Sequence, residues 1–373
     1  MKIIVNTRLL IKNKLEGIGW VTYETLKRIT REHPEHEFYF LFDRQFSDEF
    51  IFANNITPII IPPQSRHPFL WYIWFEYSLP KIIRKIKPDL FFSPDGYLSL
   101  SAQVPSIPML HDINFVHFPQ DIPYLTRKFY NYYFPKYAQK AKKIITVSNY
   151  SKKDICEQFL INENKVDVVY NGANEAYKPI SNEEKVKVKE TFTEGNDFFI
   201  FIGALNPRKN VVRLLLAYDE FRKKINSNIK MVIIGEKMFK TKNIELTYSK
   251  LKYKNDIIFT GRLSPKELNK LLNASLALTF VPYFEGFGIP IVEAFYCDTP
   301  VITSNVTSMP EVAGDAALLT NPFSVKDISE AMIKIASNKE LRQSLIEKGR
   351  IQREKFSWDK TAMEIWKSIE KAV

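Results

Sequence analysis

Two glutamates, Glu285 and Glu293, stand eight positions apart in the stretch FEGFGIPIVEAF, which otherwise consists of glycine, proline and apolar residues. An unpaired carboxylate is expensive to bury, so these charges should be either solvated or in contact with something polar. Glu293 has a structural explanation, because Pro290 suits the first turn of a helix and a carboxylate in that turn is stabilised by the helix dipole. Glu285 has a poorer one, since it follows an apolar run directly.

Two cations, Arg208 and Lys209, follow another apolar run in the loop GALNPRKN, which begins at Gly203. They stand just before the next predicted helix, for which Asn210 is a suitable N-cap. Cations are unfavourable at the positive end of a helix, which argues against an ordinary surface position for this pair. The loop is therefore predicted to bind an anion such as a diphosphate.

A ligand that carries both hydroxyls and phosphates would satisfy all of these groups. Carboxylates only accept hydrogen bonds and so suit sugar hydroxyls, while backbone N–H groups from Gly288 to Ile291 suit phosphate. The sequence contains no GxxxxGK(S/T) loop, which argues against kinases and GTPases, and no D-x-D triplet, which argues against a metal-held diphosphate. The pattern favours a nucleotide-sugar.

A glycine pair near the start of the chain, Gly17 and Gly19, precedes another predicted helix. Glycines at that place let an anion approach the helix N-terminus closely. A simple two-glycine turn explains so short a motif equally well, so the pair alone does not decide between the two.

Short runs of β-branched and aromatic residues alternate with helical patterns throughout the chain. This alternation predicts parallel βαβ units, whose ligands bind beyond the carboxyl ends of the strands. The predicted strands are at residues 2–6, 37–42, 58–61, 89–93, 107–110, 143–148, 166–170, 198–203, 230–235, 256–260, 276–281 and 300–303. The loops that carry the candidate residues follow such strands.

The hydrophobic order breaks between the two groups of strands, after residue 171. We expect a Rossmann-like domain at 1–175, a linker at 176–196 and a second Rossmann-like domain at 197–356. The last residues, 357–373, are predicted to form an amphipathic helix that has Ser357 as N-cap and returns to the first domain. The expected fold is α/β, with two doubly wound domains facing each other across a cleft.

Composition fits this organisation and limits the setting of the protein. The chain has 373 residues, 45% of them hydrophobic and 25% charged, which suffices for two globular domains. Its net charge of +11 suits anionic ligands or an anionic surface. Cys156 and Cys297 lie far apart and indicate a reducing compartment. No run has the pattern of a signal peptide or a membrane span, so a cytoplasmic location is expected, with contact at the inner face of the membrane left open.

A basic and aromatic segment at residues 122–153 has two explanations. It contains eight Lys and Arg residues and no Asp or Glu, which would suit an anionic membrane that carries a lipid-linked acceptor. Alternatively its aromatic side chains belong to the core, because they recur at helical spacing, the commoner reason for such stripes. The residues at this spacing, with two from HPFLWYIWFEY, are Trp71, Trp74, Tyr130, Tyr133, Phe134 and Tyr137. No nucleic-acid-binding motif accompanies the segment, so nucleic acid is not an expected partner.

The order of the motifs along the chain closely resembles that of glycosyltransferase family 4. The resemblance rests on GIG near the start, on GALNPRKN, and on EGFGIPIVEA followed by CDTPVITSNVTSMPEVAGDAAL; it is densest at residues 198–322. It implies the GT-B architecture of two facing Rossmann-like domains and a retaining transferase that needs no metal or other cofactor. The loop GALNPRKN is similar to that of mannosyltransferase-like members, which favours GDP-mannose over a UDP-sugar as donor.

The resemblance also implies roles for particular residues. Glu285 resembles the glutamate that holds hydroxyls of the donor sugar, and Glu293 resembles the one that accepts from the ribose. Lys209, assisted by Arg208, is similar to the cation that stabilises the departing diphosphate, and His111 to a histidine that reaches the donor sugar. The other expected donor-binding residues are Gly17, Gly19, Gly203, Arg262, Leu263, Gly286, Phe287, Gly288 and Ile289.

Two positions depart from the family pattern. Many members have an arginine after the glycine equivalent to Gly203, where this chain has Ala204, so Arg208 and Lys209 are expected to supply the positive charge alone. Asp298 stands where the family usually has glycine, and aspartate tolerates the left-handed conformation that ends many helices.

We therefore expect a retaining hexosyltransferase. It would move a hexose of the mannose or glucose type from a nucleotide-diphosphate sugar to a saccharide or lipid-linked saccharide, in cell-surface polysaccharide synthesis. Three rivals are a nucleotide-sugar epimerase, a phosphorylase on the same fold and a non-catalytic sugar-binding subunit. An epimerase would convert the donor without an acceptor, and a phosphorylase would need a cofactor lysine, for which no motif is found. The joint presence of Glu285, Lys209 and Glu293 argues against a non-catalytic subunit.

Overall fold

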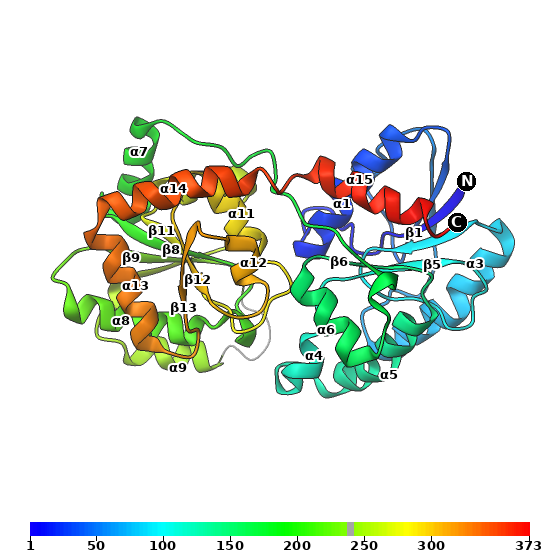
Figure 1. Cartoon of the computed structure of the whole chain (residues 1–373), viewed down its shortest axis with the longest axis horizontal. Coiled ribbons are helices and arrows are strands. Elements are labelled where there is room, and N and C mark those ends of the chain that lie inside the picture. Colours follow the sequence, from blue (N-terminus) through cyan, green and yellow to red (C-terminus); the bar gives the residue numbers. More distant parts are fainter. Residues whose placement is uncertain (237–241) are drawn as a thin grey trace. The chain divides into compact units, whose positions relative to one another are not determined.

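The chain folds into two compact units, each built on one sheet of parallel strands with helices on both faces (Figure 1). The computed structural model describes residues 1–236 and 242–373. Unit 1 comprises Met1–Asn171 and Trp358–Val373, and unit 2 comprises Gly172–Ser357. The predicted α/β class, with two doubly wound halves, is confirmed by this arrangement.

The sheet of unit 1 has seven strands in the order β3-β2-β1-β4-β5-β6-β7. All neighbouring pairs are parallel. Its strands are β1 (Lys2–Asn6), β2 (Glu37–Phe42), β3 (Ile56–Ile60), β4 (Leu90–Ser93), β5 (Ser106–Leu110), β6 (Ile144–Thr146) and β7 (Val166–Val168). The central strands are buried on both faces, which is why they are continuous apolar runs rather than alternating ones. The strand order reverses direction between β1 and β4.

The sheet of unit 2 has six parallel strands in the order β10-β9-β8-β11-β12-β13, with the reversal between β8 and β11. Its strands are β8 (Phe198–Ile202), β9 (Lys230–Ile234), β10 (Ile257–Gly261), β11 (Ala277–Phe280), β12 (Val301–Ser304) and β13 (Ala317–Thr320). Sequence analysis missed β13, because this short edge strand is only partly buried and lacks a long apolar run.

Helices connect successive strands in both units (Figure 1). Those of unit 1 are α1 (Gly17–Glu32), α2 (Pro68–Ile73), α3 (Leu79–Ile86), α4 (Asn114–His117), α5 (Tyr124–Lys140), α6 (Asn149–Phe159) and α15 (Trp358–Glu370). Those of unit 2 are α7 (Asn182–Thr193), α8 (Val211–Lys224), α9 (Lys242–Lys250), α10 (Pro265–Ala274), α11 (Ile289–Tyr296), α12 (Met309–Ala313), α13 (Val325–Ser337) and α14 (Lys339–Arg353).

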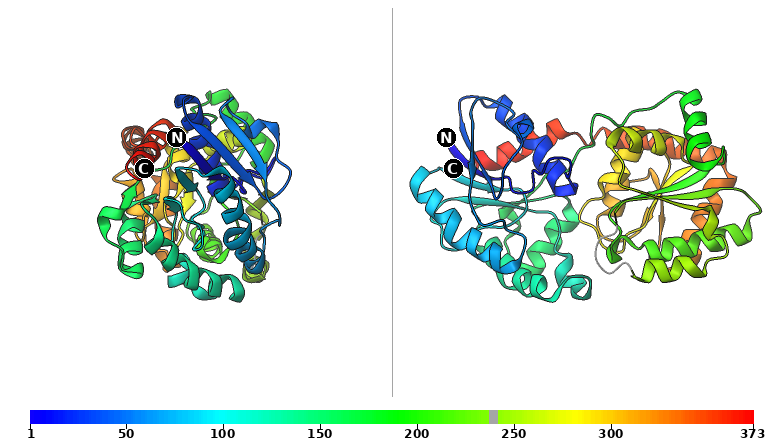
Figure 2. Two further views of the ribbon diagram at one scale, coloured as in Figure 1. Left: turned by 90° about the vertical axis from the view of Figure 1, so that its right-hand side faces the viewer. Right: turned by 180° about the vertical axis from the view of Figure 1, so that it is seen from behind.

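Two helices define how the chain is divided. The segment 176–196, expected to be a linker, contains α7, which begins with a capping box at Ser181, packs against α10 and belongs to unit 2. Helix α15 belongs to unit 1, where it packs against α1 (Figures 1 and 2). Its buried face includes Trp358, Ile365 and Trp366.

The aromatic stripe of α5 is mainly core. Phe134 and Tyr137 are buried, as is Trp74, and the other three residues of the predicted stripe pack against the same cluster: Trp71, Tyr130 and Tyr133. The core explanation is therefore confirmed for these six residues. A different set points outward, including Phe69, Tyr124 and Tyr132, whose exposures are 64%, 57% and 56%.

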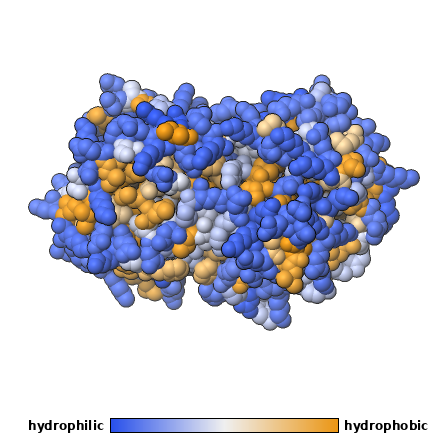
Figure 3. Space-filling model, in the orientation of Figure 1, coloured by the Kyte–Doolittle hydropathy of each residue, from blue (hydrophilic) through white to orange (hydrophobic). Residues whose placement is uncertain are grey.

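The surface in the orientation of Figure 1 is largely hydrophilic, with hydrophobic residues in small separate groups (Figure 3). Among the residues that the structure describes, no helix combines the length and the apolar character needed to cross a membrane.

A close backbone approach makes Gly235 more sensitive than other glycines with positive φ. A Cβ at Gly235 would lie 2.0 Å from the carbonyl oxygen of Gly203, whereas a Cβ at Gly195, also at positive φ, would meet nothing within 4 Å. Gly195→Ala should cost about 1 kcal/mol, the usual penalty of a left-handed alanine. Gly235→Ala should cost about 2 kcal/mol more, because backbone must move. Urea unfolding of unit 2 measures both, and equal losses would contradict this account of the β8 and β9 ends.

Candidate active site

Two loops meet at the carboxyl ends of β8 and β11, where the strand order of unit 2 reverses. The side-chain amide of Asn210 donates to the carbonyl oxygens of Val281 and Pro322, at 3.0 and 2.7 Å. The backbone N–H of Tyr283 donates to the carbonyl oxygen of Arg208 at 3.1 Å. These bonds hold the cationic loop 206–210 against the glutamate loop 282–288. The reversal point of such a sheet is where α/β proteins place their ligands.

Asn210 occupies the N-cap position of α8, as predicted, but its side chain does not cap the helix. Arg208 and Lys209 lie in a short 3₁₀ turn, Pro207–Lys209, which is capped by the side chain of Asn206. Asn210 follows in the left-handed conformation, with φ of 61°, and its side chain makes no capping bond. Asparagine tolerates that conformation, and its amide is used to join the two loops instead.

Glu285 forms an ion cluster with both cations of the neighbouring loop. Its carboxylate contacts the Lys209 ammonium and lies 3.2 Å from Arg208 Nη1. The Lys209 ammonium also lies 4.8 Å from the centre of the Phe280 ring. Burial alone would raise the pKa of Glu285, but Arg208 and Lys209 outweigh it and lower the pKa below its ordinary value. Glu285 is therefore a carboxylate, and its charge in an apolar setting is balanced by Arg208 and Lys209.

The glycine-rich turn after Glu285 is shaped by groups from α12. Gly288 has φ of 98°, and a Cβ there would lie 2.8 Å from the Met309 side chain. The Ser308 hydroxyl donates to the carbonyl oxygen of Glu285 at 2.8 Å. Helix α11 then begins at Ile289, with Pro290 in its first turn as predicted. Gly286, Phe287 and Gly288 are buried. Sequence analysis did not single out Ser308, although it lies in the quoted stretch TSMPEV.

Glu293, one turn into α11, has a different environment from Glu285. It hydrogen-bonds the hydroxyl of Tyr177, a residue of unit 2 that precedes α7. Burial raises the pKa of Glu293 to about 7, although the bond from Tyr177 opposes the shift. Within the described parts of the chain it forms no ion pair. Sequence analysis missed Tyr177, whose surroundings, NEAYKP, carry no recognisable motif.

The end of α11 shows how the chain accommodates Asp298. This residue has φ of 51°, the left-handed conformation expected where related sequences have glycine. Its carboxylate forms ion pairs with Arg350 at 2.6 Å and Arg353 at 3.2 Å. The strain of a side chain in this conformation is thus offset by contacts that glycine could not make.

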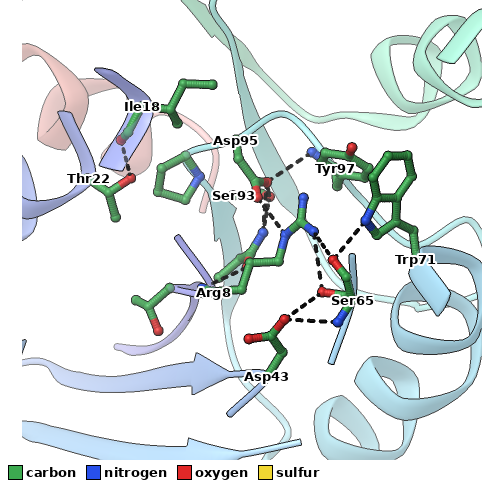
Figure 4. A network of polar contacts seen from close by, with 12 residues as sticks. Arg8, Ile18, Thr22, Asp43, Ser65, Trp71, Ser93, Asp95 and Tyr97 are labelled. Carbon is green, nitrogen blue, oxygen red and sulfur yellow. Dashed lines mark hydrogen bonds and ion pairs between the residues drawn. The ribbon is translucent and has the colours of Figure 1, made fainter. Parts of the chain in front are cut away.

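The carboxyl edge of the sheet in unit 1 carries a buried polar network centred on Arg8 and Asp95 (Figure 4). Arg8 Nε lies 2.7 Å from Asp95, and Arg8 Nη1 donates to the carbonyl oxygen of Ser65 at 3.1 Å. Asp95 also accepts from the side chains of Asn6 and Ser93. The Arg8 guanidinium lies 4.2 Å from the Tyr97 ring centre.

This network, which sequence analysis missed, joins the loops after β1, β3 and β4. Asp43, at the end of β2, extends it by accepting from the backbone N–H and hydroxyl of Ser65 (Figure 4). The only hint in the sequence is a cation, Arg8, two residues after a buried strand. A charge there needs a partner from another strand, which only the sheet order can supply.

His111, at the end of β5, is oriented by the same region. Its Nε2 lies 2.8 Å from the carbonyl oxygen of Pro94, next to Asp95. Because a carbonyl only accepts, Nε2 carries the proton and Nδ1 is the unprotonated nitrogen of the neutral ring. Burial lowers the pKa of His111, although the bond to Pro94 opposes the shift, so the ring is neutral at pH 7.

The remaining predicted residues lie at helix starts or strand ends. Gly17 and Gly19 were predicted to precede a helix. They instead lie in its first turn, because α1 begins at Gly17. Gly203 follows β8, and Arg262 and Leu263 follow β10, so these three belong to unit 2 at the carboxyl edge of its sheet. Gly17, Gly19 and His111 belong to unit 1.

None of the predicted site residues belongs to a cluster of three metal-ligating side chains. In the described ranges, the one such group lies at the end of α1 and consists of His33, Glu35 and His36.

Comparison with known proteins assigns both units. A model described as "Glycosyltransferase Family 4" matches residues 15–177, and one described as "Glycosyl transferases group 1" matches residues 182–352. The O-antigen chain mannosyltransferase B of Escherichia coli is 25% identical over 370 residues, which cover 96% of this chain and 97% of that protein.

Two further proteins are similar over different extents. The serotype-specific mannosyltransferase WbdA of Escherichia coli is 28% identical over 242 residues, 63% of this chain but only 29% of that protein. The crystal structure of HepE from Anabaena in complex with UDP-glucose has a TM-score of 0.75 at 17% identity and covers 99% of each chain. With the two parallel sheets, this likeness gives the chain the GT-B fold of such enzymes. The chain belongs to the glycosyltransferases of the family 4 type, because the Family 4 model and the group 1 model between them match nearly its whole length.

Proposed function

We propose that this glycosyltransferase transfers a hexose from a nucleotide-diphosphate sugar to a saccharide or lipid-linked saccharide, with retention of configuration and without a metal ion. The observation that carries the proposal is the cluster of Glu285, Lys209 and Arg208 at the reversal point of the sheet in unit 2. It combines an acceptor for sugar hydroxyls with two cations for a diphosphate.

The cluster suggests how leaving-group stabilisation works. The two cations are paired with Glu285, which keeps all three side chains oriented. A diphosphate beside Lys209 and Arg208 would share their charge, and the Glu285 carboxylate would then accept hydroxyls of the donor sugar. As the bond to the sugar breaks, negative charge grows on the phosphate, where preorganised cations lower the barrier most.

The acceptor hydroxyl must lose a proton during transfer. In a front-face reaction, which family membership favours, the departing phosphate oxygen takes that proton while the acceptor oxygen bonds to the anomeric carbon on the same face. The bond that forms replaces the one that breaks, so no covalent enzyme intermediate is needed. His111, neutral and with Nδ1 unprotonated, is proposed to accept a hydrogen bond from a sugar hydroxyl.

The mannosyltransferase relatives favour GDP-mannose as donor and cell-surface polysaccharide as product. The solved structure of HepE contains UDP-glucose instead, a donor with a different base and sugar. We propose that the base lies beside Arg262 and Leu263, and that Glu293 accepts from the ribose hydroxyls.

Removal of the charge of Lys209 or of Glu285 should abolish most transfer. Lys209→Met and Glu285→Gln should each lower kcat by about 100-fold or more, because each removes charge that acts on the reacting groups. The matched control is Lys187→Met, on the exposed face of α7. Initial rates with GDP-mannose, in buffer containing EDTA, measure the effect, and thermal unfolding checks that the variants are folded. A folded Lys209 or Glu285 variant with more than a tenth of normal turnover would refute the assignment.

Nucleoside diphosphate binding should tighten as the pH rises through about 7. Only ionised Glu293 accepts from both ribose hydroxyls, and its pKa is raised to about 7. The ionised fraction therefore rises about tenfold between pH 6 and 8, and the dissociation constant should fall by a similar factor. Calorimetry at both pH values measures it. Glu293→Gln should lose this pH dependence, whereas Glu190→Gln, an exposed control, should keep it.

The free energy of unfolding should fall as the pH rises, whereas nucleotide binding should tighten. The pKa of Glu293 is about 7 when folded and near its ordinary 4.5 when unfolded, so the folded state binds more protons between these values. The free energy of unfolding contributed by this group therefore falls as the pH rises from about 4.5 to 7. Tighter binding at pH 8 would then not reflect a more stable protein. A dissociation constant that changes equally in the wild type and in Glu293→Gln would contradict the ribose assignment.

We also propose that the outward face of α5 contacts an anionic membrane. Tyr124, Leu125 and Tyr132 are more than half exposed, and cations accompany them: Lys128 lies 4.7 Å from the Tyr124 ring centre and Lys136 lies 3.4 Å from that of Tyr132. Aromatic side chains flanked by cations suit an anionic interface, where a lipid-linked acceptor would be found.

Vesicle sedimentation tests this contact. The protein should bind phosphatidylglycerol vesicles more tightly than phosphatidylcholine vesicles, and Tyr124→Ser with Tyr132→Ser should weaken binding about tenfold. Leu246→Ser, an exposed apolar residue of unit 2, is the control. Unchanged binding in the tyrosine double variant would exclude this face as the contact.

A further inference from the structure

Three side chains of the types that can bind metals gather at the turn between α1 and β2, in the sequence HPEH (33–36), which the proposed transfer reaction does not use. His33 Nδ1 lies 3.6 Å from Glu35 Oε1, and His36 Nε2 lies 3.3 Å from the same oxygen. The three ligand atoms lie within 4.8 Å of one another. Two imidazoles and one carboxylate form a donor set that suits Zn²⁺ and similar first-row divalent ions.

The spacing of these atoms is close to that of an occupied site. Zinc bonds of about 2.0–2.1 Å in a tetrahedron place neighbouring ligand atoms about 3.3–3.4 Å apart. The two distances to Glu35 already have this value within a few tenths of an ångström. The two histidine nitrogens lie within 4.8 Å of each other and would need to approach each other to share an ion.

Both imidazoles are held in place by groups other than a metal. The His33 ring stacks on Trp366 with centres 3.7 Å apart, and the His36 ring stacks on the same indole at 5.1 Å. The amino group of Met1 lies 3.1 Å from His36 Nδ1, on the side away from the nitrogen that faces Glu35. Ligands that are already oriented lose little entropy on binding, which favours affinity.

The site is also accessible. The side chains of His33 and His36 are 23% and 18% exposed, and that of Glu35 is 59% exposed. An ion and its water ligands can therefore enter without opening the fold. The cluster differs from an ordinary acidic surface patch because two of its three members are imidazoles fixed by an indole.

We infer that His33, Glu35 and His36 form a binding site for Zn²⁺ or a chemically similar divalent ion, with water at the remaining position. Its effect would be on stability, because Trp366 belongs to α15, the last helix of the chain, which packs against α1. An ion that fixes both imidazoles would fix the surface on which Trp366 stacks and so strengthen the attachment of α15. The proposal is independent of the transfer reaction, whose proposed residues lie elsewhere.

The test uses the full chain without a polyhistidine tag, freed of metal by a chelator. Calorimetry with ZnCl₂ should give one ion per chain, and the thermal midpoint should rise with ZnCl₂ concentration, because an ion bound only to the folded state stabilises it. Loss of one imidazole, in His36→Asn, should weaken binding at least tenfold. His67→Asn is the matched control, since His67 caps α2 and asparagine is also a good cap.

A second pair of variants covers the case in which a histidine variant is unstable. Glu35→Gln should weaken binding while leaving the fold intact, because this side chain is exposed. Its control is Glu32→Gln, another exposed glutamate three residues earlier, which should bind Zn²⁺ as the wild type does. Affinity should fall at acid pH, since both imidazoles must be unprotonated to bind. No binding up to millimolar ZnCl₂, or equal binding in Glu35→Gln and Glu32→Gln, would overturn the inference.

Discussion

The ion cluster of Glu285, Lys209 and Arg208 is the interaction on which the proposed site in unit 2 depends. A carboxylate in a segment of glycine and apolar residues would be too costly without partners, and its two cations come from a loop 76 residues earlier in the chain. They meet because β8 and β11 are neighbours in the sheet. Buried ion pairs add little net stability compared with apolar packing, so such a cluster is better understood through the chemistry that it can do.

Much of the surrounding structure maintains this cluster. Asn210 joins the cationic loop to the end of β11, and the Ser308 hydroxyl donates to the backbone carbonyl of Glu285. Gly288 takes a conformation that allows α11 to begin immediately after the turn. The two glutamates consequently occupy opposite electrostatic settings: neighbouring cations keep Glu285 ionised, while burial raises the pKa of Glu293 to about 7. One fold thus holds two carboxylates with different protonation behaviour.

Unit 1 shows a second use of buried charge. The network around Arg8 and Asp95 pairs these charges with Asn6 and Ser65 and joins loops from several strands (Figure 4). Its effect on the proposed chemistry is indirect, through the Pro94 carbonyl that sets which nitrogen of His111 carries the proton. A polar network that is fully connected specifies one arrangement of its loops, because any alternative leaves buried groups unpaired.

The sequence by itself determined the features that depend on local preferences. Apolar runs marked twelve of the thirteen strands in the described residues, Pro290 marked the start of α11, and Asp298 was expected to tolerate a left-handed conformation, which the structure has. Residue types and spacing also singled out Glu285, Lys209 and Arg208, since each is an energetic anomaly in its local setting. These inferences need only neighbours in sequence, and periodicity and backbone propensity act over that range.

Only the tertiary structure decided which groups become partners. Asparagine is a common capping residue, but the Asn210 amide donates to the carbonyl oxygen of Val281 at the end of β11 and does not cap α8. The stripe of α5 suited either core or membrane by spacing, and its packing against α2 and β5 placed most of it in the core. Tyr177, Ser308 and the Arg8–Asp95 pair have no local signature, because each contact joins segments that meet only when the strand order is set. The members of such pairs are far apart in sequence, so local patterns cannot predict the contact. The strand order of the sheet brings them within hydrogen-bonding range.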